Sequence, residues 1–237
     1  MSWLYPNEAN YYFGGKNSVD YYNNMVTERR KNYPISSEQK YEDKIKEINE
    51  NGFTKWESVL DIDLLDSIKD KTEYLIKNNI NLKSNDEYYG MVADPFLNVK
   101  ECIQIAFSDM LLDFATDYFN CMPGIGTFNL RKSYLNNLPP KTTQLFHCDK
   151  NSIKFFKFFI YLNDVDGPED GPLTIIKSSH KKRPYNHFMQ HRWTEQDMKN
   201  LYGEDSLCYL TAKKGDLIAA TTTCYHRGTK PVAKERM

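Results

Sequence analysis

The chain has 237 residues, a length that suits one large domain or two small ones and can bury a full hydrophobic core without disulfide or metal staples. Lys and Arg together number 31 and Asp and Glu 32, so the formal net charge is −1. This near balance argues against a sequence-independent nucleic-acid binder and against docking on an anionic membrane, because both need a surplus of positive charge. We therefore expect neither a nucleic-acid nor a membrane partner.

The composition is typical of a globular protein, with 40% apolar and 14% aromatic residues. The longest apolar stretch, residues 155–162, is interrupted by Lys157 and is much shorter than the roughly 18 residues that span a bilayer. Residues 1–15 are polar, so we expect no secretory signal. The cysteines include no CxxC pair, which predicts free thiols and a cytoplasmic location; they are Cys102, Cys121, Cys148, Cys208 and Cys224.

The N-terminal half is predicted to be mainly helical. Residues 1–34 are rich in Tyr and Asn and lack clear periodicity, so they are interpreted as an irregular arm. Ser36 and Gln39 form a capping-box pair that predicts a helix start, and Gly52 is expected to end that helix. A short strand over 53–56 and helices over 63–77 and from 98 to about 122 are expected next. Residues 35–123 thus form a helical support.

After Gly124 the pattern changes to short strands separated by Gly, Pro and Asn turns. Strands are predicted over 126–134, 142–148, 153–163, 173–176, 206–211 and 216–225. One helix, over 194–202 with Thr194 as its cap, interrupts them. Helices followed by short strands predict an α+β or mainly β fold, in which helices pack on an antiparallel sandwich or barrel formed by residues 124–237. No boundary suggests separate folding, so residues 1–237 are expected to form a single domain.

His147, Asp149 and His226 are the main candidates for chemistry. Side chains alternate along a strand, so His147 and Asp149 point to one face. His226, at the end of another predicted strand, could supply a second imidazole if the two strands are neighbours in a jelly roll. Two His and one carboxylate leave three positions of a metal open, as in non-haem Fe(II) oxygenases. The HxD triplet by itself is common, and a half-buried His beside a surface Asp is the alternative.

Several ordered segments resemble the phytanoyl-CoA dioxygenase family over roughly residues 41–236. The segments are Phe146-His147-Cys148-Asp149, residues 158–165, Gly171-Pro172-Leu173, Ser178-Ser179-His180-Lys181, Lys214-Gly215-Asp216 and His226-Arg227-Gly228. The resemblance implies a double-stranded β-helix (a cupin-like jelly roll) with N-terminal helices packed on one sheet. It also implies Fe(II), 2-oxoglutarate and O2 as cofactor and cosubstrates, with His147, Asp149 and His226 as iron ligands.

The resemblance further implies that Arg236, ten residues after His226, pairs with the far carboxylate of 2-oxoglutarate. Arginine suits this role because its planar fork can donate two hydrogen bonds to one carboxylate. The sequence departs from the family at Ser178, where a Gly is usual, and at its end. The chain stops one residue after Arg236, so we expect that the last strand of the sheet is missing or frayed.

Other side chains are weaker candidates. Lys157 and Gln144 are proposed as further contacts for the cosubstrate, although Lys157 could instead extend to solvent and Gln144 faces the other side of a regular strand. Arg131, Tyr134 and Tyr161 are candidates for substrate binding. His187 and His191 are four residues apart, but without a third ligand they are interpreted as a surface pair.

These features predict an Fe(II)- and 2-oxoglutarate-dependent dioxygenase that hydroxylates an unactivated C–H bond of a small organic substrate and releases succinate and CO2. Retention of the carboxylate at Asp149 favours hydroxylation over halogenation, by resemblance to halogenating relatives that lack it. The alternatives are a cupin-like metal enzyme that does not use 2-oxoglutarate and a jelly-roll binding module that has lost catalysis. The sequence does not predict the oligomeric state or the substrate.

Overall fold

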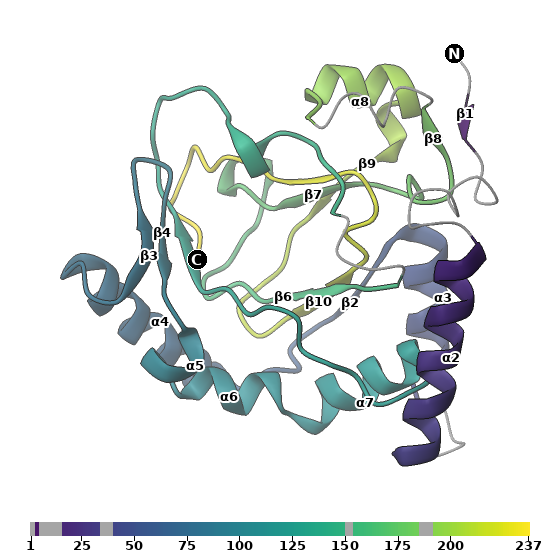
Figure 1. The fold of residues 1–237 in the computed structure, drawn as a ribbon. Coiled ribbons are helices and arrows are strands. Elements are labelled where there is room, and N and C mark those ends of the chain that lie inside the picture. Colours follow the sequence, from purple (N-terminus) through teal and green to yellow (C-terminus); the bar gives the residue numbers. More distant parts are fainter. Residues whose placement is uncertain (1–2, 5–15, 34–39, 150–153, 185–191) are drawn as a thin grey trace.

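The computed structural model describes residues 3–4, 16–33, 40–149, 154–184 and 192–237 (Figure 1). Within these ranges the helices are α2 (Lys16–Asn32), α3 (Glu42–Asn51), α4 (Ile62–Lys77), α5 (Pro95–Asn98), α6 (Glu101–Ala106), α7 (Asp109–Phe119) and α8 (Glu195–Tyr202). The strands are β1 (Trp3–Leu4), β2 (Phe53–Trp56), β3 (Leu82–Asn85), β4 (Tyr89–Val92), β5 (Arg131–Ser133), β6 (Lys157–Phe159), β7 (Leu173–Ile176), β8 (Arg183–Pro184), β9 (Leu207–Leu210), β10 (Leu217–Ala220) and β11 (His226–Gly228).

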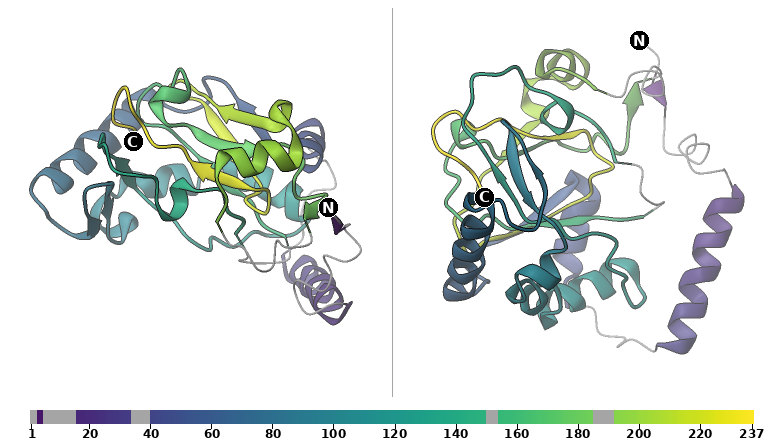
Figure 2. Two further views of the ribbon diagram at one scale, coloured as in Figure 1. Left: turned by 90° about the horizontal axis from the view of Figure 1, so that it is seen from above. Right: turned by 60° about the vertical axis from the view of Figure 1, so that its left-hand side comes forward.

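The strands form small antiparallel sheets. In one sheet β10 lies between β2 and β6, and in a second β7 lies between β11 and β9. The hairpin β3–β4 pairs with β5 in a third sheet, and β1 pairs with β8. Helices α3 to α7 gather along one side of these sheets, α8 lies on the other side beside β9, and α2 stands at an edge of the molecule (Figures 1 and 2). Mixed helices and antiparallel sheets confirm the expected α+β character.

The sheet β2–β10–β6 is buried on both faces. On one face, Ala219 packs with Ile48 of α3 and Phe114 of α7. On the other, Ile218 and Phe159 pack with residues of β7 and β9 in the second sheet. Alternating side chains of one strand thus reach the helices and the second sheet in turn. The sheet β2–β10–β6 therefore lies between the N-terminal helices and the sheet β11–β7–β9, which carries His226 on strand β11.

The helix boundaries follow local hydrogen bonds. Asp61 caps α4 by accepting from the backbone N–H groups of Asp63 and Leu64. Thr194 caps α8 in a capping box with Asp197, which confirms the predicted cap. Gly52 ends α3 with a left-handed φ of 94°, as predicted from its glycine. The proposed start at Ser36 and Gln39 lies outside the described residues, and the described part of this helix begins at Glu42.

Two N-terminal predictions are wrong. Residues 16–32 form α2 rather than an irregular arm, because this helix has little apolar periodicity for a pattern search to find. Residues 98–122 do not form one helix but α6, α7 and part of α5. The break falls at Ser108, whose extended backbone and hydroxyl bond to the Ile105 carbonyl close α6 before α7 starts. The hairpin β3–β4 was not predicted.

Most predicted strands are shorter in the structure. The segments 126–134 and 153–163 keep only β5 and β6 as regular strands, and the segment 216–225 is regular only over β10. Residues 142–144 form a 3-10 turn, η2 (Thr142–Gln144), instead of the start of a strand, and Thr142 has a left-handed φ of 48°. Only single bridges follow η2, at Phe146 and His147. The described helices include none that is both long and apolar enough to cross a bilayer.

Candidate metal and cosubstrate site

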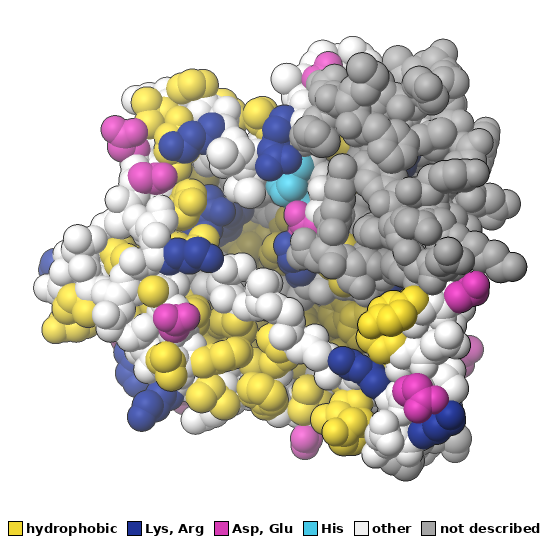
Figure 3. All heavy atoms as spheres, viewed as in Figure 1, with side chains coloured by type: hydrophobic (Ala, Val, Ile, Leu, Met, Phe, Trp, Pro, Cys, Tyr) yellow, Lys and Arg dark blue, Asp and Glu magenta, His cyan; other side chains and the backbone are white. Residues whose placement is uncertain are grey.

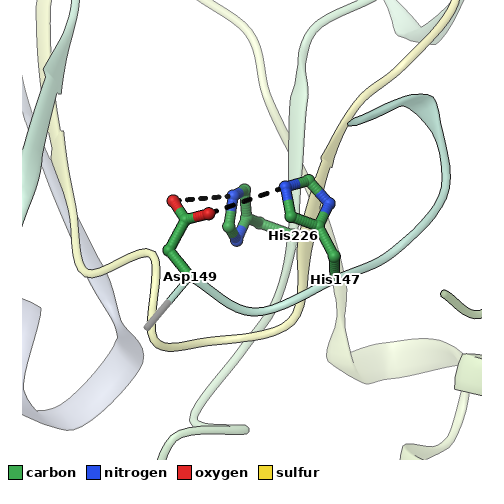
Figure 4. Close-up of side chains that lie close together, drawn as sticks. All are labelled: His147, Asp149 and His226. Atoms are coloured by element: carbon green, nitrogen blue, oxygen red, sulfur yellow. Dashed lines mark ion pairs between the residues drawn. The ribbon is translucent and has the colours of Figure 1, made fainter. Parts of the chain in front are cut away.

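His147, Asp149 and His226 come together at the start of β11. His147 and His226 exchange both backbone hydrogen bonds, at 3.0 and 2.9 Å, and their ring centroids lie 4.3 Å apart. Asp149 is held beside the two histidines because its backbone N–H donates to the carbonyl of Thr222 at 2.9 Å. β11 in turn pairs with β7, with His226 opposite the buried Ile175. Two segments far apart in sequence are thus joined by backbone pairing at the site (Figure 4).

The three side chains converge on one point. Asp149 Oδ1 lies 3.8 Å from Nε2 of His147, and Oδ2 lies 3.6 Å from Nε2 of His226. One ligand atom from each residue lies within 4.8 Å of the others, which is a spacing that a single metal ion can bridge. Both imidazoles are buried, and the carboxylate side chain is 19% exposed. The site is therefore open from the carboxylate side.

The hydrogen bonds of the histidines fit a metal ion. Nδ1 of His147 lies 2.9 Å from the Leu145 carbonyl, and Nδ1 of His226 lies 3.0 Å from the Cys224 carbonyl. A carbonyl only accepts, so Nδ1 of each neutral ring carries the hydrogen. Nε2 of each ring is then a free lone-pair donor directed toward Asp149. Metal-binding histidines are commonly oriented by such bonds, and the donor set fits Fe(II).

The electrostatics favour the ligand protonation states. Burial lowers the pKa of His147, and burial together with the neighbouring His147 lowers the pKa of His226 to about 3. Burial opposes ionisation of Asp149, but His226 and the Lys157 ammonium outweigh it and lower the pKa of this carboxyl. At neutral pH the site therefore presents two neutral imidazoles and one carboxylate, the states in which these groups bind metals.

Lys157 lies at this site, on strand β6. Its Nζ is 2.5 Å from Oδ2 of Asp149. The backbone of Lys157 is held opposite Ala220 of β10. The sequence analysis expected this side chain either at an anion or in solvent, and the structure places it on the carboxylate of Asp149.

Arg236 lies beside the same strand as His226. Its Nη2 donates to the Ser133 hydroxyl at 3.1 Å and would lie 3.4 Å from a Cβ at Gly228. Gly228 is two residues from His226 and so faces the same side of β11. The chain end is not frayed: Arg236 pairs with Ser133, and the Met237 carbonyl accepts from the N–H of Leu162 at 2.9 Å.

Arg131 adds a second guanidinium to this region. It shares a face of β5 with Ser133, donates to the Thr143 hydroxyl at 3.3 Å and lies over the Tyr89 ring at 3.7 Å. Burial and the charge of Arg236 lower the pKa of Arg131 to about 10. Among the described residues neither arginine forms an ion pair with a carboxylate. Two neighbouring cations without an acid between them suit an anionic ligand.

Other candidates are placed differently. Tyr134 follows β5 directly, and its hydroxyl donates to the side-chain oxygen of Asn85 at 2.7 Å and lies against Gly90, so its role in substrate binding stays a prediction. The Tyr161 hydroxyl is engaged by the backbone of Leu173 and Leu210, so it joins β7 to β9. Gln144 is buried, and its side-chain oxygen caps η2 at Lys141 N. His187 and His191 lie outside the described residues.

Ser133, Thr143 and Gly228 were missed by the sequence analysis, although each touches one of the two arginines. Ser133 could have been predicted from the sequence, because it lies two residues after Arg131 on a predicted strand and so shares a face with Arg131. Contacts of Thr143 and Gly228 depend on η2 and β11 lying side by side, which no local pattern predicts.

Around the site the surface is hollowed and lined by basic groups. Figure 3 shows a histidine and an acidic side chain within this hollow, with Lys or Arg side chains around them. A separate pocket of about 190 Å³ is lined by residues of α3, α7, the segment before β6 and the loop after β10. It is lined by Ile48, Asn49, Tyr118, Lys154, Phe155, His180, Thr221 and Thr223. Thr221 and Thr223, the neighbours of the Thr222 that binds the backbone of Asp149, thus both line this pocket.

Comparisons with known proteins agree with this geometry. The model of the phytanoyl-CoA dioxygenase family (PhyH) matches residues 48–232, and the chain belongs to that family. It is thereby a 2-oxoglutarate-dependent oxygenase, with iron and 2-oxoglutarate as cofactor and cosubstrate. No curated protein matches the chain by sequence.

Solved structures show the same fold at low sequence identity. HygX from Streptomyces hygroscopicus, with nickel, 2-oxoglutarate and hygromycin B bound, is 14% identical with a TM-score of 0.54, over 85% of this chain and 84% of HygX. EctD from S. alaskensis, with 2-oxoglutarate and 5-hydroxyectoine, is 14% identical with a TM-score of 0.59, over 86% and 73%. SnoK, a carbocyclase dependent on alpha-ketoglutarate from nogalamycin biosynthesis, is 15% identical with a TM-score of 0.58, over 86% and 81%.

Proposed function

We propose that this protein is an Fe(II)- and 2-oxoglutarate-dependent dioxygenase that hydroxylates a C–H bond of a small organic substrate and releases succinate and CO2. The convergence of His147, Asp149 and His226 within 4.8 Å is the observation that carries this proposal. Family membership and the cosubstrate seen in HygX and EctD support it. A double-stranded β-helix is the fold that we propose for the two facing sheets.

The triad and Arg236 have separate roles in this scheme. His147, Asp149 and His226 would hold the metal on one face and leave the opposite face for ligands. Arg236 would bind the distal carboxylate of 2-oxoglutarate, because its guanidinium lies beside the face of β11 that carries His226. Iron, 2-oxoglutarate and O2 would supply the oxidising chemistry: one oxygen atom of O2 enters the C–H bond as C–OH, and the other enters succinate as 2-oxoglutarate loses CO2.

The remaining residues orient and shield the ligands. The Leu145 and Cys224 carbonyls hold the two imidazoles in their orientation, so little rearrangement is needed when metal binds. Lys157 and Gln144 remain proposed contacts for the cosubstrate. Arg131 remains a candidate for substrate binding, and its pairing with an anion would satisfy the buried Nε that has no partner in the structure. Tyr161 is proposed as a wall of the pocket.

Two alternatives use the same triad. A cupin-like metal enzyme would not need 2-oxoglutarate, and a binding module that has lost catalysis would not turn it over. The placement of Arg236 beside β11, without an acidic partner among the described residues, favours the 2-oxoglutarate enzyme over the cupin-like enzyme, and succinate formation separates it from the binding module. SnoK is described as a carbocyclase, so ring closure in place of hydroxylation is an outcome that product analysis must distinguish.

Succinate formation tests the proposal. Wild-type protein with Fe(II), 2-oxoglutarate, ascorbate and O2 should release succinate, and the complex without O2 should show a weak visible charge-transfer band. Asp149→Ala should lose both signals because a ligand is removed. Arg236→Gln should keep metal binding and weaken 2-oxoglutarate binding by roughly 10- to 100-fold, the worth of a charge-assisted hydrogen bond.

Lys214→Met is the control, because it breaks a Lys–Asp pair with Asp66 on α4. It should keep wild-type turnover. Wild-type protein that binds Fe(II) but neither shows the band nor releases succinate would refute the proposal. Unchanged 2-oxoglutarate affinity in Arg236→Gln would remove Arg236 from the site.

A further inference from the structure

Lys157 forms an ion pair with the carboxylate of Asp149, which is one of the three groups proposed to bind the metal. Nζ of Lys157 lies 2.5 Å from Oδ2 of Asp149, and the same oxygen lies 3.6 Å from Nε2 of His226. The Lys157 backbone is fixed by pairing with β10, but its side chain is 34% exposed. The ammonium therefore lies beside the point on which the three ligand atoms converge, at the end of a flexible stem.

The charges at this point balance without a metal. Two neutral imidazoles and one carboxylate carry −1, and the Lys157 ammonium carries +1. A divalent cation among the three ligands would place two further positive charges next to Lys157, in a setting that screens them poorly. Lys157 and the metal thus compete for Asp149, and after metal binding the ammonium needs another anion.

A carboxylate held at the metal would supply that anion. We propose that Lys157 is an exchange residue: it neutralises Asp149 in the metal-free protein and moves to the metal-proximal carboxylate of 2-oxoglutarate once metal is bound. This inference rests on the proposed function for its second half only. Because binding energies are linked, each ligand should then strengthen the binding of the other.

A purely orienting role for Lys157 makes the opposite prediction. If the ammonium only holds Asp149 in position for the metal, its removal should weaken metal binding. If it competes, removal should strengthen the binding of metal alone and weaken the effect of 2-oxoglutarate. The sign of the change in metal affinity therefore separates the two roles.

Mn(II) binding to the metal-free protein provides the test, with free Mn(II) measured by electron paramagnetic resonance. Lys157→Met should bind Mn(II) alone at least about threefold more tightly than wild type, because a competing cation is gone. Saturating 2-oxoglutarate should tighten Mn(II) binding at least about fivefold in wild type, the low end of measured couplings, and much less in Lys157→Met. Lys157→Arg should retain the coupling.

Lys214→Met is the matched control, since it removes another partly buried lysine paired with an aspartate, at 2.7 Å, and should leave both affinities unchanged. Thermal unfolding confirms that each variant is folded. Weaker Mn(II) binding in Lys157→Met, or undiminished coupling, overturns the exchange. If 2-oxoglutarate leaves Mn(II) binding by wild type unchanged, the proposed function and the exchange fail together, while the metal-only comparison still decides whether Lys157 competes for Asp149.

Discussion

Two buried histidines, His147 and His226, and the partly buried His180 tie the stability of the metal-free protein to pH. Burial lowers the pKa values of His147, His180 and His226 below the ordinary 6.5. Near pH 6.5 the histidines of the unfolded chain therefore bind protons, whereas those of the folded protein stay neutral. Their contribution to the free energy of unfolding is thus complete above about pH 6.5 and is lost as the pH falls. We expect the Tm in the presence of a chelator to fall steadily between about pH 7 and pH 5.

Thermal unfolding at fixed ionic strength measures this effect. His180 offers a check outside the metal triad, because its Nδ1 lies 3.0 Å from Cys224 Sγ and its Nε2 lies 3.0 Å from the Asn49 carbonyl. His180→Asn should reduce the dependence of Tm on pH, although it also lowers Tm at neutral pH. A Tm that stays constant over this range would contradict the buried, neutral state of the histidines.

Sequence motifs together with the family resemblance predicted which side chains meet at the site, but not how they pair. The HxD spacing and His226 suggested the triad, and the ordered segments that resemble the phytanoyl-CoA dioxygenase family singled it out. The contact of Lys157 with Asp149 was not predictable, since it depends on β6 and the 147–149 segment lying side by side. Tyr134 lies one residue beyond β5, and because a shift of one residue along a strand moves a side chain to the opposite face, its place at the pocket stays a prediction.

At the scale of elements, the end of α3 is tightly coupled to the site. Gly52 has a φ of 94°, and a Cβ there would lie 2.4 Å from Sγ of Cys224, two residues before His226. Gly52→Ala should lower the free energy of unfolding by at least about 1–2 kcal/mol, the cost of a left-handed alanine, with the clash in addition. Displacement of Cys224, whose carbonyl orients His226, should also weaken Mn(II) binding.

Urea unfolding of Gly52→Ala beside Gly126→Ala tests this prediction. Gly126 has nothing within 4 Å of its Cβ position and no left-handed φ, so its replacement should stay within about 0.5 kcal/mol of wild type. Equal unfolding midpoints for the two variants would show that the turn after α3 adapts freely to a side chain.

Elements with strong local signals were predicted well, and those held by distant partners were not. Helix α8 and strand β7 match their predicted ranges closely, because a capping box and a short apolar run between turns define them. α2 and the β3–β4 hairpin lack such signals. The strands around the site are short because the chain crosses between sheets there, and a pairing that changes partner every few residues has no sequence period.

For the whole molecule, the central sheet joins both halves of the chain. β2 from the helical half pairs over its full length with β10 from the strand-rich half, and β10 also pairs with β6. Without residues 40–123, β10 would lose a neighbouring strand, and the face bearing Ala219 would lose its cover from Ile48 and Phe114. We therefore predict that neither half buries a complete core by itself, so the single domain stays a prediction for the experiment below.

A fragment of residues 124–237 tests this interdependence. It should show little dispersion in amide NMR spectra and no cooperative urea transition, because an exposed β10 edge and an uncovered apolar face leave a partly packed state. Addition of the separately produced fragment 40–123 should restore both the dispersion and Mn(II) binding, since β2 then supplies the missing edge. If the fragment 124–237 alone unfolds cooperatively and binds Mn(II), the N-terminal helices only cover an autonomous metal-binding domain.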